Sequence, residues 1–111
     1  MIDFYSWGEV VIDGSRYTSD VVISPDGVKP WWRSRGHWLD LADIDELVRE
    51  APEVVVIGTG VPGQVRVPAD ALEKLKARHI WVVVEPTDRA CQTYNELSRS
   101  QRVVAALHLT C

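Results

Sequence analysis

The second half of the chain alternates between short apolar runs and stretches in which apolar residues recur at helical spacing. The runs 54–57, 80–84 and 103–109 are almost continuously apolar, which is typical of strands buried on both faces of a parallel sheet. In 68–78 and 87–99, apolar residues recur every three or four positions, as on the buried face of a helix. This alternation predicts a mainly parallel sheet with right-handed crossovers.

Each predicted helix has a residue suited to its start. Asp40 is placed to cap a helix that runs to about residue 50, and apolar residues follow it at helical spacing. Pro68 suits the start of the second helix, because the first turn of a helix needs no N–H from that residue. Thr87 is placed to cap the third helix.

The first third of the chain has the pattern of β-strands joined by turns. An apolar run at 9–12 is followed by the turn pair Asp13-Gly14, and the run 17–23 is followed by Pro25-Asp26-Gly27. We therefore expect an antiparallel meander that packs beside the parallel sheet or extends it. The stretch 29–38 contains proline, glycine and several charges, so we expect it to be irregular.

The length and composition fit one folded domain that spans residues 1–111. Of these 111 residues, 46% are hydrophobic and 25% are charged, which is the balance of a globular protein rather than a disordered one. No run approaches the roughly 18 consecutive apolar residues of a membrane span. The net charge of −4 argues against general binding to nucleic acid or to an anionic membrane, since both need a positive field.

The N-terminus and the cysteines bear on the cellular compartment. The first residues have neither the basic and apolar regions of a secretory signal nor the arginine-rich composition of a transit peptide. Cys91 and Cys111 form no Cys-x-x-Cys pair, and no histidine lies at metal-ligand spacing from either. We therefore expect a cytoplasmic protein with reduced thiols and no bound metal.

A glycine-rich loop, 58–63, follows the first apolar run of the parallel sheet. Its glycines match the G-x-G-x-x-G pattern of dinucleotide-binding loops, and Glu85 stands where such a motif places its ribose-binding acid. Here, however, a proline interrupts the loop and 64–67 has the pattern of a short strand, so the helix begins too late to meet a pyrophosphate. We expect no NAD, FAD or other cofactor. We favour a tight turn, with an anion-binding loop as the alternative.

The same loop and the start of the third helix are candidates for one shared site. The carboxyl ends of parallel strands border the usual ligand crevice, and free amides with a helix dipole would favour an anionic group there. The candidate ligand-binding residues are Gly58, Thr59, Gly60, Thr87, Cys91, Tyr94 and Asn95. The alternative is structural. In that case Thr87 caps its helix and Cys91 is a buried, inert thiol. Tyr94 and Asn95 would then satisfy buried main-chain groups.

The stretch 31–38 is unusual because tryptophans alternate with basic residues. Such residues can anchor a protein interface, can bind bases and phosphates, or can simply cover one end of a sheet. The acidic net charge argues against nucleic acid. We expect this stretch to cover the sheet and to present a rim to a partner. The candidate partner-facing residues are Trp31, Trp32, Arg33, Arg35 and His37.

Several segments together resemble the small Mth-type domain family. The resemblance covers nearly the whole chain and is carried mainly by Gly58-Thr59-Gly60, the helix from Thr87 and the run 103–109. The stretch SDVVISPDGVKPWWRSRGHWL also resembles the bacterial members. The family includes an adipogenesis-associated Mth-domain protein and a mitochondrial assembly factor of respiratory complex I. The resemblance implies a three-layer α/β arrangement with a mixed, mainly parallel central sheet, flanking helices and an added N-terminal β meander. It implies no catalytic residues.

Two functions agree with these observations. The first is a non-catalytic protein-binding or assembly module, whose partner is another protein or a second copy of the chain. The chain contains no Ser-His-Asp order, His-Glu-x-x-His motif or Walker loop, and this favours the first function. The alternative is a small enzyme or ligand-binding domain that holds an anionic group at the Gly58–Gly60 loop and the N-terminus of the Thr87 helix. The residues alone leave catalysis undecided.

Overall fold

A computed structural model gives the fold, and the structure describes residues 1–33 and 36–111. Within this part of the chain there are eight strands and three helices. The strands are β1 (Ile2–Ser6), β2 (Glu9–Ile12), β3 (Ser15–Tyr17), β4 (Val21–Ser24), β5 (Gly27–Pro30), β6 (Val54–Gly58), β7 (Trp81–Glu85) and β8 (Val103–Leu107). The helices are α1 (Leu41–Leu47), α2 (Ala69–Ala77) and α3 (Thr87–Leu97).

Five strands form a mixed central sheet in the order β5-β4-β8-β6-β7. β6 lies between β8 and β7 and is parallel to both, whereas β4 is antiparallel to β8 and to β5. Helices α2 and α3 connect the three parallel strands, so the strand–helix alternation predicted for the second half is confirmed. The strands β1, β2 and β3 form a separate antiparallel sheet.

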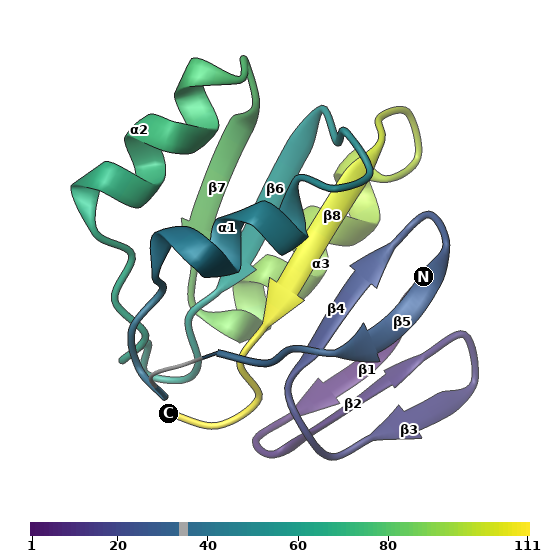
Figure 1. Cartoon of the computed structure of the whole chain (residues 1–111). Coiled ribbons are helices and arrows are strands. Elements are labelled where there is room, and N and C mark those ends of the chain that lie inside the picture. The colour runs from purple at the N-terminus through teal and green to yellow at the C-terminus, as the bar shows by residue number, and fades with distance from the viewer. Residues whose placement is uncertain (34–35) are drawn as a thin grey trace.

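The central sheet is covered differently on its two faces (Figure 1). Val55 and Ile57 pack into a core cluster with α1 and α2, while Val54 and Val56 pack into a second cluster with α3 and the small sheet. This double cover explains why β6 is apolar at successive positions. The predicted three-layer α/β arrangement with an added N-terminal meander is therefore confirmed.

The predicted meander is divided between the two sheets. The stretch 17–23 was expected to be one strand. Instead, β3 ends at residue 17 and β4 begins at residue 21. Between the two strands, a carboxylate oxygen of Asp20 accepts a hydrogen bond from the main-chain amide of Leu109 at 2.8 Å. This contact holds the chain where it leaves the small sheet and joins the edge of β8.

Three further details differ from the sequence-based expectations. β1 was not predicted, and β5 overlaps the start of the stretch 29–38 that was expected to be irregular. A short edge strand tolerates glycine and proline because it needs hydrogen bonds along one side only. The stretch 64–67 is not a strand, since within it only Arg66 forms an isolated bridge, with Trp38.

Two helix starts show how local chemistry and tertiary structure compete. The amide of Asp40 donates to Asp43 Oδ2 at 2.9 Å, so the predicted start of α1 is correct, although the helix ends at Leu47 rather than near residue 50. The prediction that Thr87 caps α3 is wrong. Pro86 occupies the cap position, and Thr87 is the first helical residue with its side chain fully buried.

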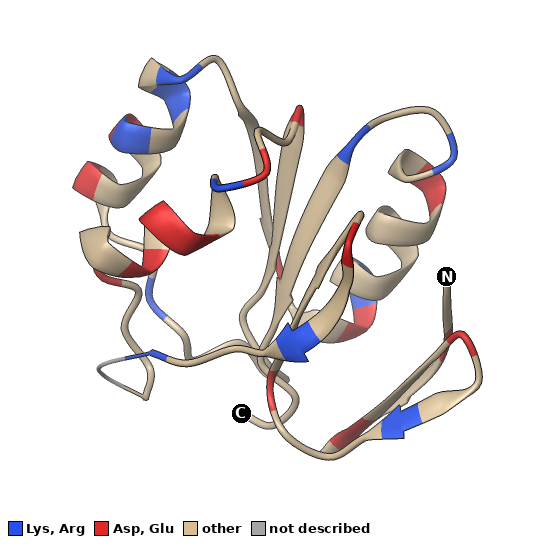
Figure 2. Cartoon of the chain, turned by 45° about the vertical axis from the view of Figure 1, so that its right-hand side comes forward, with Lys and Arg blue, Asp and Glu red and all other residues tan. Residues whose placement is uncertain are grey.

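All the charged residues of α1 are acidic (Figure 2), and two of them make specific contacts. Asp45 lies 2.7 Å from Lys74 of α2, and Glu46 lies 3.5 Å from Lys29 of β5. These exposed pairs join α1 to its two neighbours, and solvent screening keeps their contribution to stability small.

Candidate functional site

The predicted meeting of the glycine loop with α3 is confirmed. Gly58 and Glu85 are register partners at the carboxyl ends of β6 and β7. The Gly60 amide donates to Thr87 Oγ1 at 2.8 Å, and Thr87 Oγ1 donates to the carbonyl oxygen of His108 at 2.6 Å. The Thr59 amide donates to the Glu85 carbonyl oxygen at 2.9 Å. We call this set of contacts the glycine junction.

The glycine junction holds main chain against main chain rather than a ligand. The anion-binding alternative needs free amides at Thr59 and Gly60, but both amides are bonded within the chain. A Cβ atom at Gly60 would lie 2.5 Å from the carbonyl oxygen of Thr110, and Gly60 has a φ of +98°. This geometry agrees with the favoured interpretation, a tight turn that needs glycine, and argues against an anion bound at these two amides.

The remaining candidates on α3 lie away from the glycine junction. Asn95 makes two hydrogen bonds of 2.8 Å with the main chain of Ile2, so it fastens β1 to α3, as the structural alternative supposed. Tyr94 belongs to the core cluster between α3 and the sheets. Cys91 is buried, and burial, followed by the charge of Asp88, raises the pKa of its thiol to about 12.

A buried polar cluster, which the sequence did not predict, joins three distant segments. His108 Nδ1 lies 2.7 Å from Asp20 Oδ2, and an Arg33 terminal nitrogen lies 2.8 Å from the same carboxylate oxygen and 3.2 Å from His108 Nδ1. The Arg33 side chain is only 6% exposed and the Asp20 side chain 19%. We call Asp20, Arg33 and His108 the ionic cluster.

Aromatic rings surround the ionic cluster. The guanidinium carbon of Arg33 lies 4.2 Å from the ring centre of Trp31, which is itself buried, and the ring of His37 meets that of His108 edge-on at 5.2 Å. Arg33 Nε donates to the Gly36 carbonyl oxygen at 2.9 Å. The other terminal nitrogen of Arg33 and the indole nitrogen of Trp31 are buried and have no hydrogen-bond partner among the contacts of the described chain.

The charge of Asp20 is stabilised by its neighbours. Burial alone would raise the pKa of this carboxyl group. Hydrogen bonds from His108, the Leu109 amide and Arg33 outweigh that effect, so the pKa of Asp20 lies below its ordinary value of 3.8. The ionic cluster therefore holds a carboxylate against a guanidinium in a largely buried position, where loss of either partner would leave the other charge uncompensated.

The chemistry of the ionic cluster is structural in this geometry. His108 Nε2 lies 3.4 Å from the Thr110 hydroxyl, so a carboxylate, an imidazole and a hydroxyl occur in series. His108 is only 7% exposed, however, and its carbonyl oxygen is already bound by Thr87. A substrate would have to reach a buried ring, and this argues against a catalytic role for the three groups. Among the described residues, no group of three or more His, Cys, Asp and Glu side chains could hold a metal ion.

The ionic cluster places Trp32 on the surface. Trp31 and Arg33 are both anchored inward, whereas Trp32 between them is 83% exposed. His37 is exposed while its ring touches His108. Arg35, the remaining partner-facing candidate, lies outside the described residues. A cavity of about 610 Å³ lies between the start of α1 and the start of α2. It is lined by Trp38, Leu39, Asp40, Leu41, Ala42, Pro68, Ala69 and Asp70.

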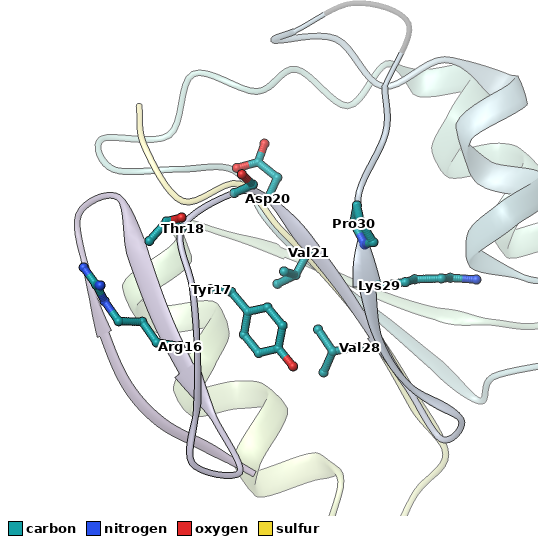
Figure 3. A pocket seen from close by; sticks show the side chains of 9 residues that line it. Arg16, Tyr17, Thr18, Asp20, Val21, Val28, Lys29 and Pro30 are labelled. Carbon is teal, nitrogen blue, oxygen red and sulfur yellow. The ribbon is translucent and has the colours of Figure 1, made fainter.

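A second cavity, of about 320 Å³, separates the small sheet from the β4–β5 hairpin. Figure 3 shows Tyr17, Val21 and Val28 at its centre, with Arg16 and Lys29 pointing away on opposite sides. Asp20 stands at the rim and turns its carboxylate away from the cavity (Figure 3). The cavity is therefore mainly apolar, and it is not an extension of the ionic cluster.

Comparison with known proteins places the chain in a family. A model of the family described as "Protein of unknown function (DUF498/DUF598)" matches residues 2–108. The chain belongs to this DUF498/DUF598 family. A curated relative, NADH dehydrogenase [ubiquinone] 1 alpha subcomplex assembly factor 3 of Danio rerio, is 33% identical over 99 residues. That match covers 86% of this chain and 55% of the relative, so the chain spans about half the length of the curated protein.

Solved structures place the family in the predicted fold. A conserved hypothetical protein of Pyrococcus horikoshii OT3 has a TM-score of 0.90 and 26% identity, and the match covers 100% of this chain and 99% of that one. A Bordetella pertussis protein described as a Mth938-like domain has a TM-score of 0.70 and 24% identity, with 98% of this chain and 85% of that one covered. The predicted resemblance to the Mth-type family is thus confirmed. No helix among the described residues of this DUF498/DUF598 member has the length and apolar character needed to cross a membrane.

Proposed function

We propose that this chain is a non-catalytic protein-binding module with an assembly-type role, and that the segment around Trp32 is its contact surface. Support comes from the curated relative of Danio rerio, whose name describes an assembly factor. That relative is almost twice as long as the matched region, so the proposal concerns this domain alone. The single observation that carries the proposal is the position of Trp32.

Trp32 has the features of an interface anchor. Its side chain is 83% exposed, although the residues on both sides of it are buried. Arg33 is fixed by the ionic cluster and by its stacking on Trp31, so Trp32 is presented from an ordered base. Tryptophan dominates many interface hot spots, and binding through a segment whose neighbouring side chains are already anchored loses less conformational entropy than binding through a mobile one.

A cavity beside Trp38, a few residues further along the chain, is the second part of the proposed contact surface. Its lining combines the half-exposed apolar side chains of Trp38 and Leu41 with the carboxylates of Asp40 and Asp70. We therefore propose a partner that offers an apolar pocket to Trp32. For the cavity beside Trp38, the partner would present an apolar side chain flanked by basic ones.

The test compares two exposed tryptophans. Wild-type chain, Trp32→Ala and Trp7→Ala are used in parallel to capture proteins from the native cell, and Trp7 is a matched control because it is 62% exposed on the small sheet. A hot-spot contribution of about 2 kcal/mol predicts a roughly 30-fold loss of one captured protein with Trp32→Ala. The same protein should bind normally to Trp7→Ala. Equal recovery with both variants would refute the role of Trp32.

A further inference from the structure

The outer edge of the central sheet, at β7, offers unused main-chain hydrogen bonds. β7 is the last strand in the sheet order and, within residues 1–33 and 36–111, pairs only with β6 (Figure 1). Its sequence is Trp-Val-Val-Val-Glu, with no proline or lysine that would block the pairing of another strand. Trp81 is 57% exposed and Val84 is 42% exposed, so large apolar side chains accompany this edge.

The hydrogen bonds to β6 show which residues face outward. The Trp81 amide donates to the Glu53 carbonyl oxygen, and the Glu85 carbonyl oxygen accepts from the Thr59 amide, so both residues turn their main chain toward β6. In a parallel strand, alternate residues turn to opposite sides. Val82 and Val84 therefore direct their N–H and C=O groups to the open edge.

Both ends of this open edge are closed by local structure. The Ile80 amide is already bound to the carbonyl oxygen of Leu75, and Pro86 has no N–H group to donate. Within β7, this leaves two donors and two acceptors at the open edge, all of them on Val82 and Val84. A strand that pairs here must supply matching groups at the same two-residue spacing.

We infer that β7 pairs with β7 of a second copy of this chain, antiparallel and centred on Val83. In this register Val82 of each copy lies opposite Val84 of the other. These are the positions that exchange two hydrogen bonds in an antiparallel pair, so all four open groups of each edge find partners. A register centred on Val82 or Val84 would leave some of these groups unpaired. The proposal is independent of the function proposed for Trp32.

The side chains also suit this two-fold register. On the face covered by α2, Val82 and Val84 of the two copies would form an apolar group, which buries the exposed part of Val84. On the face covered by α3, Trp81 would lie opposite Glu85, whose carboxylate lies 3.9 Å from Arg89. No like charges would face each other, and the exposed indole of Trp81 would meet the exposed guanidinium of Arg89.

The first experiment measures the mass of the full chain by sedimentation equilibrium, up to about 100 μM, where a complex of micromolar affinity is largely formed. We expect twice the mass of one chain, and at least a tenfold weaker association for Val84→Lys. Phe4→Lys is the matched control, because Phe4 is an exposed apolar residue on an edge strand of the small sheet. A monomer at every concentration, or equal association of Val84→Lys and wild type, would overturn the proposal. So would selective loss of association with Phe4→Lys.

A second experiment tests the register itself. In a background with Cys91→Ala and Cys111→Ser, Val83→Cys should form an intermolecular disulfide on mild oxidation. Its Cα atoms in the two copies would be about 4.5 Å apart, within the range that a disulfide spans. Trp81→Cys should not crosslink, because four residues of strand would separate the two Trp81 positions by roughly 13 Å. Crosslinking of Trp81→Cys alone, or of neither variant, would refute the register. A foreign strand at this edge would block crosslinking of Val83→Cys.

Discussion

The glycine junction and the ionic cluster meet at His108, yet they are built by opposite means. In the glycine junction, Thr87 binds the His108 carbonyl oxygen, and the contacts are between main-chain groups and one hydroxyl. In the ionic cluster, the His108 ring contacts a carboxylate and a guanidinium from segments far away in the sequence. The glycine pattern thus marks a close approach of two main-chain segments, whereas the tertiary fold alone assembles the charged group.

The largest expected effect comes from filling the glycine junction. For Gly60→Ala we expect a loss of about 4 kcal/mol in the free energy of unfolding, because the unfavourable positive φ and a clash with rigid main chain add together. The new Cβ atom would lie 2.5 Å from the Thr110 carbonyl oxygen and 2.8 Å from the carbonyl carbon of Cys111. Urea unfolding followed by circular dichroism measures the loss.

Gly8→Ala is the matched control for this substitution. Gly8 has a φ of +89°, close to that of Gly60, but nothing lies within 4 Å of its added Cβ atom. The strain of the backbone alone should cost about 1 kcal/mol. If the two variants lose similar stability, close packing is not the reason for glycine at residue 60.

The next largest effect should come from removing the charge of the ionic cluster. Asp20→Asn keeps the size of the side chain and an acceptor for the Leu109 amide but leaves the buried Arg33 guanidinium without its carboxylate. We expect a loss of about 3 kcal/mol in the free energy of unfolding, measured by urea titration. Asp45→Asn is the control. Its 2.7 Å pair with Lys74 is largely exposed and screened by solvent, so the loss should be much smaller than that of Asp20→Asn.

A smaller effect is expected from the hydroxyl of the glycine junction. Thr87→Val preserves the shape of a fully buried side chain but leaves the Gly60 amide and the His108 carbonyl oxygen without this partner. The free energy of unfolding should fall by about 2 kcal/mol. Thr87→Ser retains the hydroxyl and should lose only about 1 kcal/mol through the missing methyl group. A Val variant as stable as wild type would mean that the hydroxyl is dispensable.

The pH dependence of stability should show the contribution of the Asp20 charge to the ionic cluster. Because the folded state lowers the pKa of Asp20, the stabilisation it provides is fully present well above its unfolded value of 3.8 and is lost as the pH falls below that value. The difference in unfolding free energy between wild type and Asp20→Asn should therefore shrink in acid. Glu9 and Asp45 also have lowered pKa values, but they are present in both proteins and cancel. A difference that is constant with pH would contradict the expectation.

The sequence predicted what periodicity and local chemistry encode. The apolar runs of β6, β7 and β8 and the helical spacing between them led to the correct layers. The ionic cluster could not be predicted, because Asp20 and His108 are 88 residues apart and each stands alone among apolar or turn residues. The only signal was one histidine inside an otherwise apolar run. Thr87 was predicted to be a cap, but its hydroxyl donates to the carbonyl oxygen of His108. A contact so distant in the sequence cannot be predicted from a local pattern.

The reactivity of Cys91, which sequence reasoning placed near the glycine junction, tests how firmly α3 covers the core. Because burial raises the pKa of this thiol to about 12, hardly any thiolate exists at pH 8. In folded protein, alkylation of Cys91 by iodoacetamide should be at least about 100-fold slower than alkylation of Cys111, which is only half-buried. Peptide mass spectrometry separates the two sites, and unfolding in urea should make their rates similar. Rapid labelling of folded Cys91 would mean that α3 opens readily from the small sheet, and that the Asn95 contacts to β1 do not hold that side of the core closed.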